Sequence, residues 1–236
     1  IQPDLAAEAS FRLARGDYQG AHALCMKILE SDPASAEAFT LLAILAGDHD
    51  NHAKAIELFD RALASAPDHA KALVYKARSL IALLRRDEAV EAARAAARLN
   101  PDEAHTLDTL GVVFSRAGLH ADAVPFYEAA IRANPEPANF HYNLGAALQF
   151  IGAMDRARNA YEACLERAPR DTRALSAIVQ ITRQTDQSND IARLEAAFDA
   201  TSDDAEDALR IGHALAKAHE DLGHAAKALD WLRRAK

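Results

Sequence analysis

Residues 138–169 read ANFHYNLGAALQFIGAMDRARNAYEACLERAP, and this stretch decides the fold. It places the small residues Gly145, Ala157 and Cys164 and the aromatic Tyr161 at set intervals, and it ends on Pro169. Small residues let two helix axes approach closely, whereas proline lacks an N–H and disfavours helix in the preceding residue. We therefore expect two short helices that pack on each other, followed by a turn at the proline.

The same order of residue types recurs with a period of 34 residues. Prolines stand at positions 33, 67, 101, 135 and 169. A period of about 20–50 residues is typical of solenoids, in which each repeat is one supersecondary unit stacked on the next. The period predicts five repeats, at about 2–35, 36–69, 70–103, 104–137 and 138–171.

These residues resemble the tetratricopeptide repeat (TPR) family. The match is most specific in the fourth and fifth repeats, at Leu110-Gly111, Ala123, Tyr127, Ala130, Leu144-Gly145, Ala157, Tyr161 and Cys164. The resemblance implies an all-α fold, an α-solenoid of stacked TPR helix–turn–helix repeats that forms a right-handed superhelix. It also implies that the first helix of every repeat (the A helix) lines a concave groove, while the second (the B helix) packs behind it.

Several positions have expected structural roles. Glycine favours the left-handed conformation of a tight turn, so the A–B turns are expected at Gly118, Gly152 and, less clearly, Gly16. Acidic residues after the prolines, Asp68, Asp102 and Asp171, are expected to cap the next A helix. Pro125 predicts a late start or a slight bend in the second helix of the fourth repeat. The third repeat is weaker, since Lys76 and Ala93 replace the usual apolar and aromatic residues.

After residue 171 the pattern degenerates. Helices are predicted near 172–183 and 188–199, and Thr201 to Asp204 reads as a turn and N-cap for a longer helix over about 205–221. A truncated final repeat follows, so that residues 172–236 form a degenerate TPR-like pair plus that partial repeat. An apolar face around Leu229, Trp231 and Leu232 is expected to be exposed and could pair with a second copy of the chain.

Composition excludes several classes of protein. The 236 residues are 50% hydrophobic with a formal net charge of −8, which supports a packed core and argues against a general nucleic-acid binder. No apolar run reaches the roughly 18 residues of a membrane span, and the beginning of the chain lacks a signal-like pattern. Cys25 and Cys164 fall at helix B packing positions and are expected to be reduced core residues. These features predict a cytoplasmic protein with neither a nucleic-acid nor a membrane partner.

Catalytic and cofactor motifs are not found in the sequence. It contains neither GxxxxGK[ST] nor GxGxxG. The histidine pairs His49/His52 and His219/His224 lack a convincing third metal ligand and are interpreted as turn residues. We therefore expect no catalytic residue, no cofactor, no metal and no enzymatic activity in this chain.

A binding surface is the remaining candidate for function. The A-helix residues that are not expected to pack between helices carry hydrogen-bonding groups suited to an extended peptide. The groove candidates are Lys71, Tyr75, Arg78, His105, Asp108, Thr109, Arg116, Asn139, Tyr142, Asn143 and Gln149, with Glu37, Thr40, Ile44 and Val112 beside them. The positions with which TPR proteins clamp the carboxylate of chaperone tails hold Ala6, Ser10, Leu41, Lys71 and Tyr75 here, so we reject that ligand.

Two functional hypotheses remain. The first is a non-catalytic TPR module that binds a partner peptide or protein segment in its groove. The second is the substrate-recruiting N-terminal region of a larger transferase. Residues 208–236, ALRIGHALAKAHEDLGHAAKALDWLRRAK, are similar to the segment that joins TPRs to the catalytic domain in bacterial TPR–sulfotransferase proteins. A sulfotransferase is therefore the first candidate for such a parent protein, and a TPR glycosyltransferase is the second.

Overall fold

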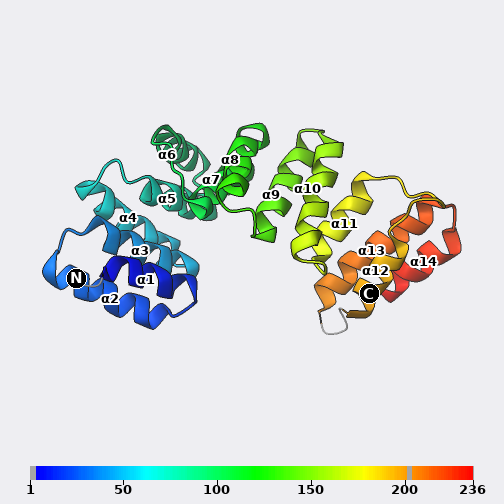
Figure 1. Ribbon diagram of the computed structural model, residues 1–236, viewed down its shortest axis with the longest axis horizontal. Coiled ribbons are helices and arrows are strands. Elements are labelled where there is room, and N and C mark those ends of the chain that lie inside the picture. The colour runs from blue at the N-terminus through cyan, green and yellow to red at the C-terminus, as the bar shows by residue number, and fades with distance from the viewer. Residues whose placement is uncertain (1–3, 201–203, 236) are drawn as a thin grey trace. The chain divides into compact units, whose positions relative to one another are not determined.

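The computed structural model describes residues 4–200 and 204–235, and within them the chain is all-helical (Figure 1). An isolated antiparallel bridge joins Thr185 and Ser188, and the described residues form no strand. No helix among them combines the length and the apolarity that crossing a membrane requires. The helices are α1 (Leu5–Ala14), α2 (Tyr18–Ser31), α3 (Ala36–Asp48), α4 (His52–Ser65), α5 (Ala70–Ala82), α6 (Arg86–Arg98), α7 (Ala104–Arg116), α8 (His120–Ala133), α9 (Ala138–Phe150), α10 (Met154–Arg167), α11 (Thr172–Ile181), α12 (Ile191–Ala200), α13 (Ala205–Asp221) and α14 (Ala225–Arg234).

Consecutive helices from α1 to α10 pack as hairpins, and the regularly spaced prolines lie between the hairpins. Pro33 separates α2 from α3, and Pro169 separates α10 from α11. The prediction that each proline closes a helix pair is therefore confirmed. In the C-terminal part, α11 and α12 each pack against α13, and α13 packs against α14.

The chain divides into two compact units, residues 1–133 and residues 134–236. The first unit holds α1–α8 and the second holds α9–α14. The division into five repeats and a degenerate segment after residue 171 stays a prediction. Of the predicted N-terminal turn of α13, Thr201, Ser202 and Asp203 lie outside the described residues. Asp204 is its N-cap and accepts hydrogen bonds from two backbone N–H groups.

The A helix after each proline begins at the same place. Its N-cap residue lies two positions beyond the proline, at Ser35, His69, Glu103, Pro137 and Asp171. Asp171 caps α11 as predicted, since its side chain accepts from two N–H groups of the first turn. The cap predictions for Asp68 and Asp102 were wrong, because each residue lies one position before the N-cap. His69 caps α5 instead, with Nδ1 3.4 Å from the nitrogen of Ala72.

Small residues and large rings complement each other between the A and B helices. A Cβ placed on Gly111 would lie 2.6 Å from Cε1 of Tyr127, and one on Gly145 would lie 2.6 Å from Cε1 of Tyr161. Phe59 fills the same position in the second repeat and is buried. In the third repeat, the position of the ring is taken by Ala93, which is fully buried. The packing roles assigned to these residues from the sequence are confirmed for the two glycine–tyrosine pairs.

Both cysteines of the chain lie on B helices. Cys25 and Cys164 are free and buried, and burial raises the pKa of each thiol to about 11.

Pro125 lies inside α8, which begins at His120. The predicted late start of this helix was wrong. The helix begins ahead of the proline because only one backbone hydrogen bond is lost at Pro125, while the packed face around Ala123 and Tyr127 remains buried.

The A–B turns contain a residue with positive φ every 34 residues. These residues are Gly16, Asp50, Leu84, Gly118 and Gly152, with φ between 58° and 80°. The three predicted glycine turns are confirmed. Leu84 has φ 59° and its side chain is 90% exposed. A leucine in the left-handed region is strained by roughly 1–2 kcal/mol, because Cβ approaches the following carbonyl oxygen.

Leu84→Gly is expected to raise the free energy of unfolding by about 1 kcal/mol. Glycine removes the backbone strain, and no buried contact is lost because the leucine is exposed. Part of the gain is offset because glycine has more conformational freedom in the unfolded chain. Urea unfolding followed by circular dichroism measures the change. A destabilised Leu84→Gly variant would show that the leucine makes contacts that outweigh its strain.

The apolar face predicted at the C-terminus is smaller than expected. Leu229 and Leu232 are 50% and 41% exposed, as predicted. The prediction for Trp231 was wrong. Its ring is buried, lies edge-on to Phe198 of α12 at 5.1 Å and is covered by the guanidinium of Arg234.

Candidate peptide-binding site on the A helices

The A helices of the first unit surround a pocket of about 260 Å³, which we call the A-helix pocket. It gathers four of the predicted groove residues, Lys71, Tyr75, Arg78 and His105, together with Ile44. Its other lining residues are Ser10, Leu13, Ala14, Leu41, Asp48 and Glu103. Residues from α1, α3, α5 and the beginning of α7 therefore meet at one place, as the periodicity of the A helices requires.

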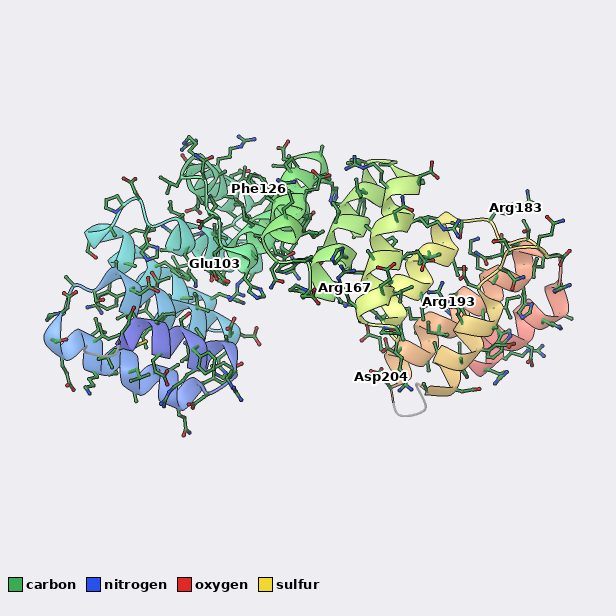
Figure 2. The ribbon with its side chains drawn as sticks, in the orientation of Figure 1. Glu103, Phe126, Arg167, Arg183, Arg193 and Asp204 are labelled. Carbon is green, nitrogen blue, oxygen red and sulfur yellow. The ribbon has the colours of Figure 1, made fainter. Side chains whose placement is uncertain are left out.

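The A-helix pocket combines an apolar floor with two ion pairs. Leu41 and Ile44 on α3 are buried and supply apolar surface. Lys71 Nζ lies 3.3 Å from Oε2 of Glu103, which Figure 2 labels near the beginning of α7. Arg78 Nη2 lies 2.6 Å from Oδ1 of Asp48. The charges in this pocket are therefore compensated within the protein, and its apolar floor is the part that offers surface to a ligand.

Tyr75 is the aromatic residue of this pocket. Burial raises the pKa of its hydroxyl, partly opposed by a hydrogen bond with Thr109 and by the charge of Lys71. The guanidinium of Arg78 lies 4.9 Å from the centre of the Tyr75 ring. The phenol therefore stays neutral near pH 7 and presents both a hydrogen-bonding group and a ring held in place by Arg78.

A second pocket of about 290 Å³ adjoins the first, and we call it the turn pocket because it lies at the C-terminal ends of α3, α5 and α7. Asp48 and Arg78 line both pockets. The predicted residues Arg116 and Val112 line the turn pocket, together with Gly47, Asp50, His52, Ile81, Ala82 and Val113. The two pockets make a continuous row along the A helices of the first unit.

Other predicted residues of the first unit serve the fold. Asp108 is buried, and the Thr109 hydroxyl donates to the carbonyl of His105. Thr40 is also buried and donates to the carbonyl of Ala36. Oε2 of Glu37 lies 3.1 Å from Nε2 of His69, and this hydrogen bond is the main cause of the lowered pKa of the Glu37 carboxyl group.

In the second unit, the predicted residues lie on α9 and contact their own neighbours. Tyr142 lies under the guanidinium of Arg173 at 4.5 Å and packs against the Tyr161 ring at 5.7 Å. Gln149 accepts a 2.7 Å hydrogen bond from the Tyr161 hydroxyl. Asn139 is exposed and Asn143 is half-buried. The structure therefore brings most of the predicted residues of α5 and α7 to the two pockets, whereas two of the four predicted residues on α9 help to hold the second unit together.

Models of known families match along most of the chain. A model of the N-terminal TPR region of psidin matches residues 43–148. Two tetratricopeptide repeat models match residues 6–70 and 138–171. The chain belongs to the tetratricopeptide repeat family. A search of curated proteins found no match to this TPR chain.

Solved structures share the TPR fold over most of the chain. The pilF protein of Pseudomonas aeruginosa is 21% identical, with a TM-score of 0.63, and the match covers 96% of this chain and 95% of that one. YrrB, described as a TPR protein with an unusual peptide-binding site, is 18% identical, with a TM-score of 0.58 and coverage of 87% and 96%. The Cut9–Hcn1 hetero-tetramer of APC/C is 18% identical, with a TM-score of 0.64, and covers 98% of this chain and 42% of the other. At these identities the likeness shows the fold alone. The TPR fold is that of a protein–protein interaction module.

The sequence interpretation missed the acidic residues of the A-helix pocket, Asp48 and Glu103. A signal for them exists in the TPR period, because their partners Arg78 and Lys71 lie 30 and 32 residues away. Residues about one repeat apart lie at corresponding places in neighbouring repeats, so opposite charges at this spacing can pair. The same spacing joins Glu162 and Arg193 of the second unit, labelled in Figure 2 at Arg193.

Proposed function

We propose that this TPR module binds an extended peptide segment of a partner protein along the A helices of its first unit. The observation that supports this proposal is the A-helix pocket, in which four residues predicted from the sequence surround buried apolar residues. An apolar side chain of the peptide enters this pocket against Leu41 and Ile44. The peptide main chain then runs along the row of pockets, where side-chain donors and acceptors compensate its N–H and C=O groups.

Polar side chains of the second unit pair with one another, as those of the A-helix pocket do. The Thr172 hydroxyl donates to Asp207 at 2.6 Å, and Lys217 pairs with Asp221, which also accepts from the backbone of Gln184. These groups are compensated within the unit, as Lys71 and Arg78 are in the A-helix pocket, so the placement of the peptide rests on the apolar floor of that pocket rather than on its charges.

Peptides selected from a random 12-residue phage library on the whole chain test this proposal. For a selected peptide, Lys71→Ala/Tyr75→Ala is expected to weaken binding at least tenfold while leaving the helical circular dichroism unchanged. The control variant Tyr142→Ala/Asn143→Ala removes a tyrosine and an uncharged polar side chain from α9 and is expected to have a smaller effect. Peptides that bind both variants as they bind the unaltered chain would contradict the A-helix pocket as the binding site.

Two finer proposals concern the C-terminal part of the chain. Exposed Leu229 and Leu232 support self-association through α14. The similarity of residues 208–236 to the linking segment of TPR–sulfotransferases supports a substrate-recruiting role within a larger transferase. Both are compatible with peptide binding by the first unit.

A further inference from the structure

A hollow of about 620 Å³ lies against α6, and none of its lining residues belongs to the A-helix pocket or the turn pocket. Six of its residues come from α6, at the helical spacing that places them along one side. We call it the α6 hollow, and it is lined by Arg86, Asp87, Val90, Glu91, Arg94, Arg98 and, from the turn before α8, Leu119. It is more than twice as large as either pocket on the A helices.

Three arginines carry the positive charge of the α6 hollow. Within the described residues, no ion pair or hydrogen bond engages the side chains of Arg86, Arg94 or Arg98, although Asp87 and Glu91 are nearby on the same helix. Arg86 reaches the next repeat, where a Cβ added to Gly118 would lie 3.2 Å from its Nη2. That position is close to the first turn of α8, whose free N–H groups carry partial positive charge. The hollow is therefore locally basic on a chain whose net charge is −8.

Exposed leucines precede this basic surface. Leu83 is 42% exposed and Leu84 is 90% exposed, two residues before Arg86. Leu84 also has positive φ at a turn position where three other repeats have glycine. Folding therefore does not explain the leucine, since glycine would remove the strain and water would no longer contact an apolar side chain. Strain of this kind points to a function outside the fold.

We propose that the α6 hollow and Leu83–Leu84 form a second docking surface, which binds an acidic, amphipathic segment of a partner protein. Carboxylates of that segment pair with Arg86, Arg94 and Arg98, because a guanidinium binds a carboxylate through two parallel hydrogen bonds. An apolar side chain of the segment packs on Leu84. The leucines, together with Val90 and Leu119 in the hollow, favour a protein segment over a polyphosphate chain.

A defined probe tests this proposal. It is a fluorescein-labelled 14-residue peptide with glutamate on one helical face and leucine on the other, titrated into the whole chain and followed by anisotropy. We expect saturable binding that weakens at least tenfold in Arg94→Glu/Arg98→Glu and that weakens with salt. Arg158→Glu/Arg170→Glu makes the same change in net charge at exposed positions of the second unit and is expected to leave binding unchanged. Leu84→Gly is expected to weaken binding while stabilising the fold, a combination that a purely structural role would not produce.

Three outcomes would overturn the proposal. The first is that the unaltered chain does not bind the peptide. The second is that Arg94→Glu/Arg98→Glu binds it as tightly as the unaltered chain does. The third is that this variant loses as much affinity for a control peptide, in which lysine replaces glutamate, as it loses for the acidic peptide. Tight binding of a single-stranded oligonucleotide that depends on the same arginines would assign the surface to nucleic acid instead. Lys71→Ala/Tyr75→Ala should bind the acidic peptide normally. A loss there would place the peptide in the A-helix pocket and refute the α6 surface, whereas failure of the A-helix proposal would leave this test unaffected.

Discussion

Phe59→Ala is expected to lower the free energy of unfolding of the first unit by about 3–5 kcal/mol, the range for truncating a buried aromatic residue. The Phe59 ring is 1% exposed and packs in a cluster with Phe39, Ala43 and Ile44. Several of its neighbours in the cluster are alanines, whose side chains are too short to move into the space that the ring leaves. Most of the cavity left by the ring would therefore remain in the variant. The free-energy cost of this cavity adds to the free energy that is lost because the ring is no longer buried.

Urea unfolding measures this change, with Phe11→Ala as the matched control. Phe11 lies on α1 and is 57% exposed, so its loss is expected to cost less than 1 kcal/mol. The single tryptophan, Trp231, belongs to the second unit. The unfolding midpoint followed by its fluorescence should therefore change less than the midpoint followed by circular dichroism. If Phe59→Ala and Phe11→Ala unfolded at the same urea concentration, the ring of the second repeat would not be the core residue described above.

Gly145→Leu is expected to destabilise the second unit by about 1–3 kcal/mol, as overpacking generally does. Even the first carbon of the new side chain would lie 2.6 Å from Cε1 of Tyr161. The tyrosine cannot move aside easily, because its ring is 1% exposed and its hydroxyl donates to Gln149. The strain must therefore be relieved by separating α9 from α10, which also disturbs the packing of Tyr142 on Tyr161.

Trp231 fluorescence during thermal unfolding reports on this unit directly. Ala196→Leu, at an exposed position of α12, adds a side chain of the same kind and is expected to leave the midpoint nearly unchanged. An unaltered midpoint for Gly145→Leu would mean that the A and B helices of the fifth repeat do not approach closely at Gly145, and the assigned TPR phase would then be incorrect.

The candidate site was partly predictable from the sequence. Lys71, Tyr75, Arg78 and His105 could be placed on one row because A-helix positions repeat with the period of the prolines. The role of Gln149 could not be foreseen, because a polar A-helix residue can face a ligand or bond to a buried hydroxyl of its own hairpin. Only the approach of Tyr161 decides between these roles. Likewise, Asp68 and Asp102 looked like caps, but a shift of one residue in the start of the helix assigns the cap to the next residue.

The sequence by itself determined the helical class, the 34-residue period and the close approach of Gly145 and Tyr161, because these follow from local backbone preferences and from side-chain size. Which polar groups remain free depends on distances between side chains of different helices, which no local preference encodes. The tertiary structure alone therefore decided that Asp48 and Arg78 pair between two pockets, that Trp231 is buried against Phe198, and that Arg94 and Arg98 face a hollow without partners in the described residues.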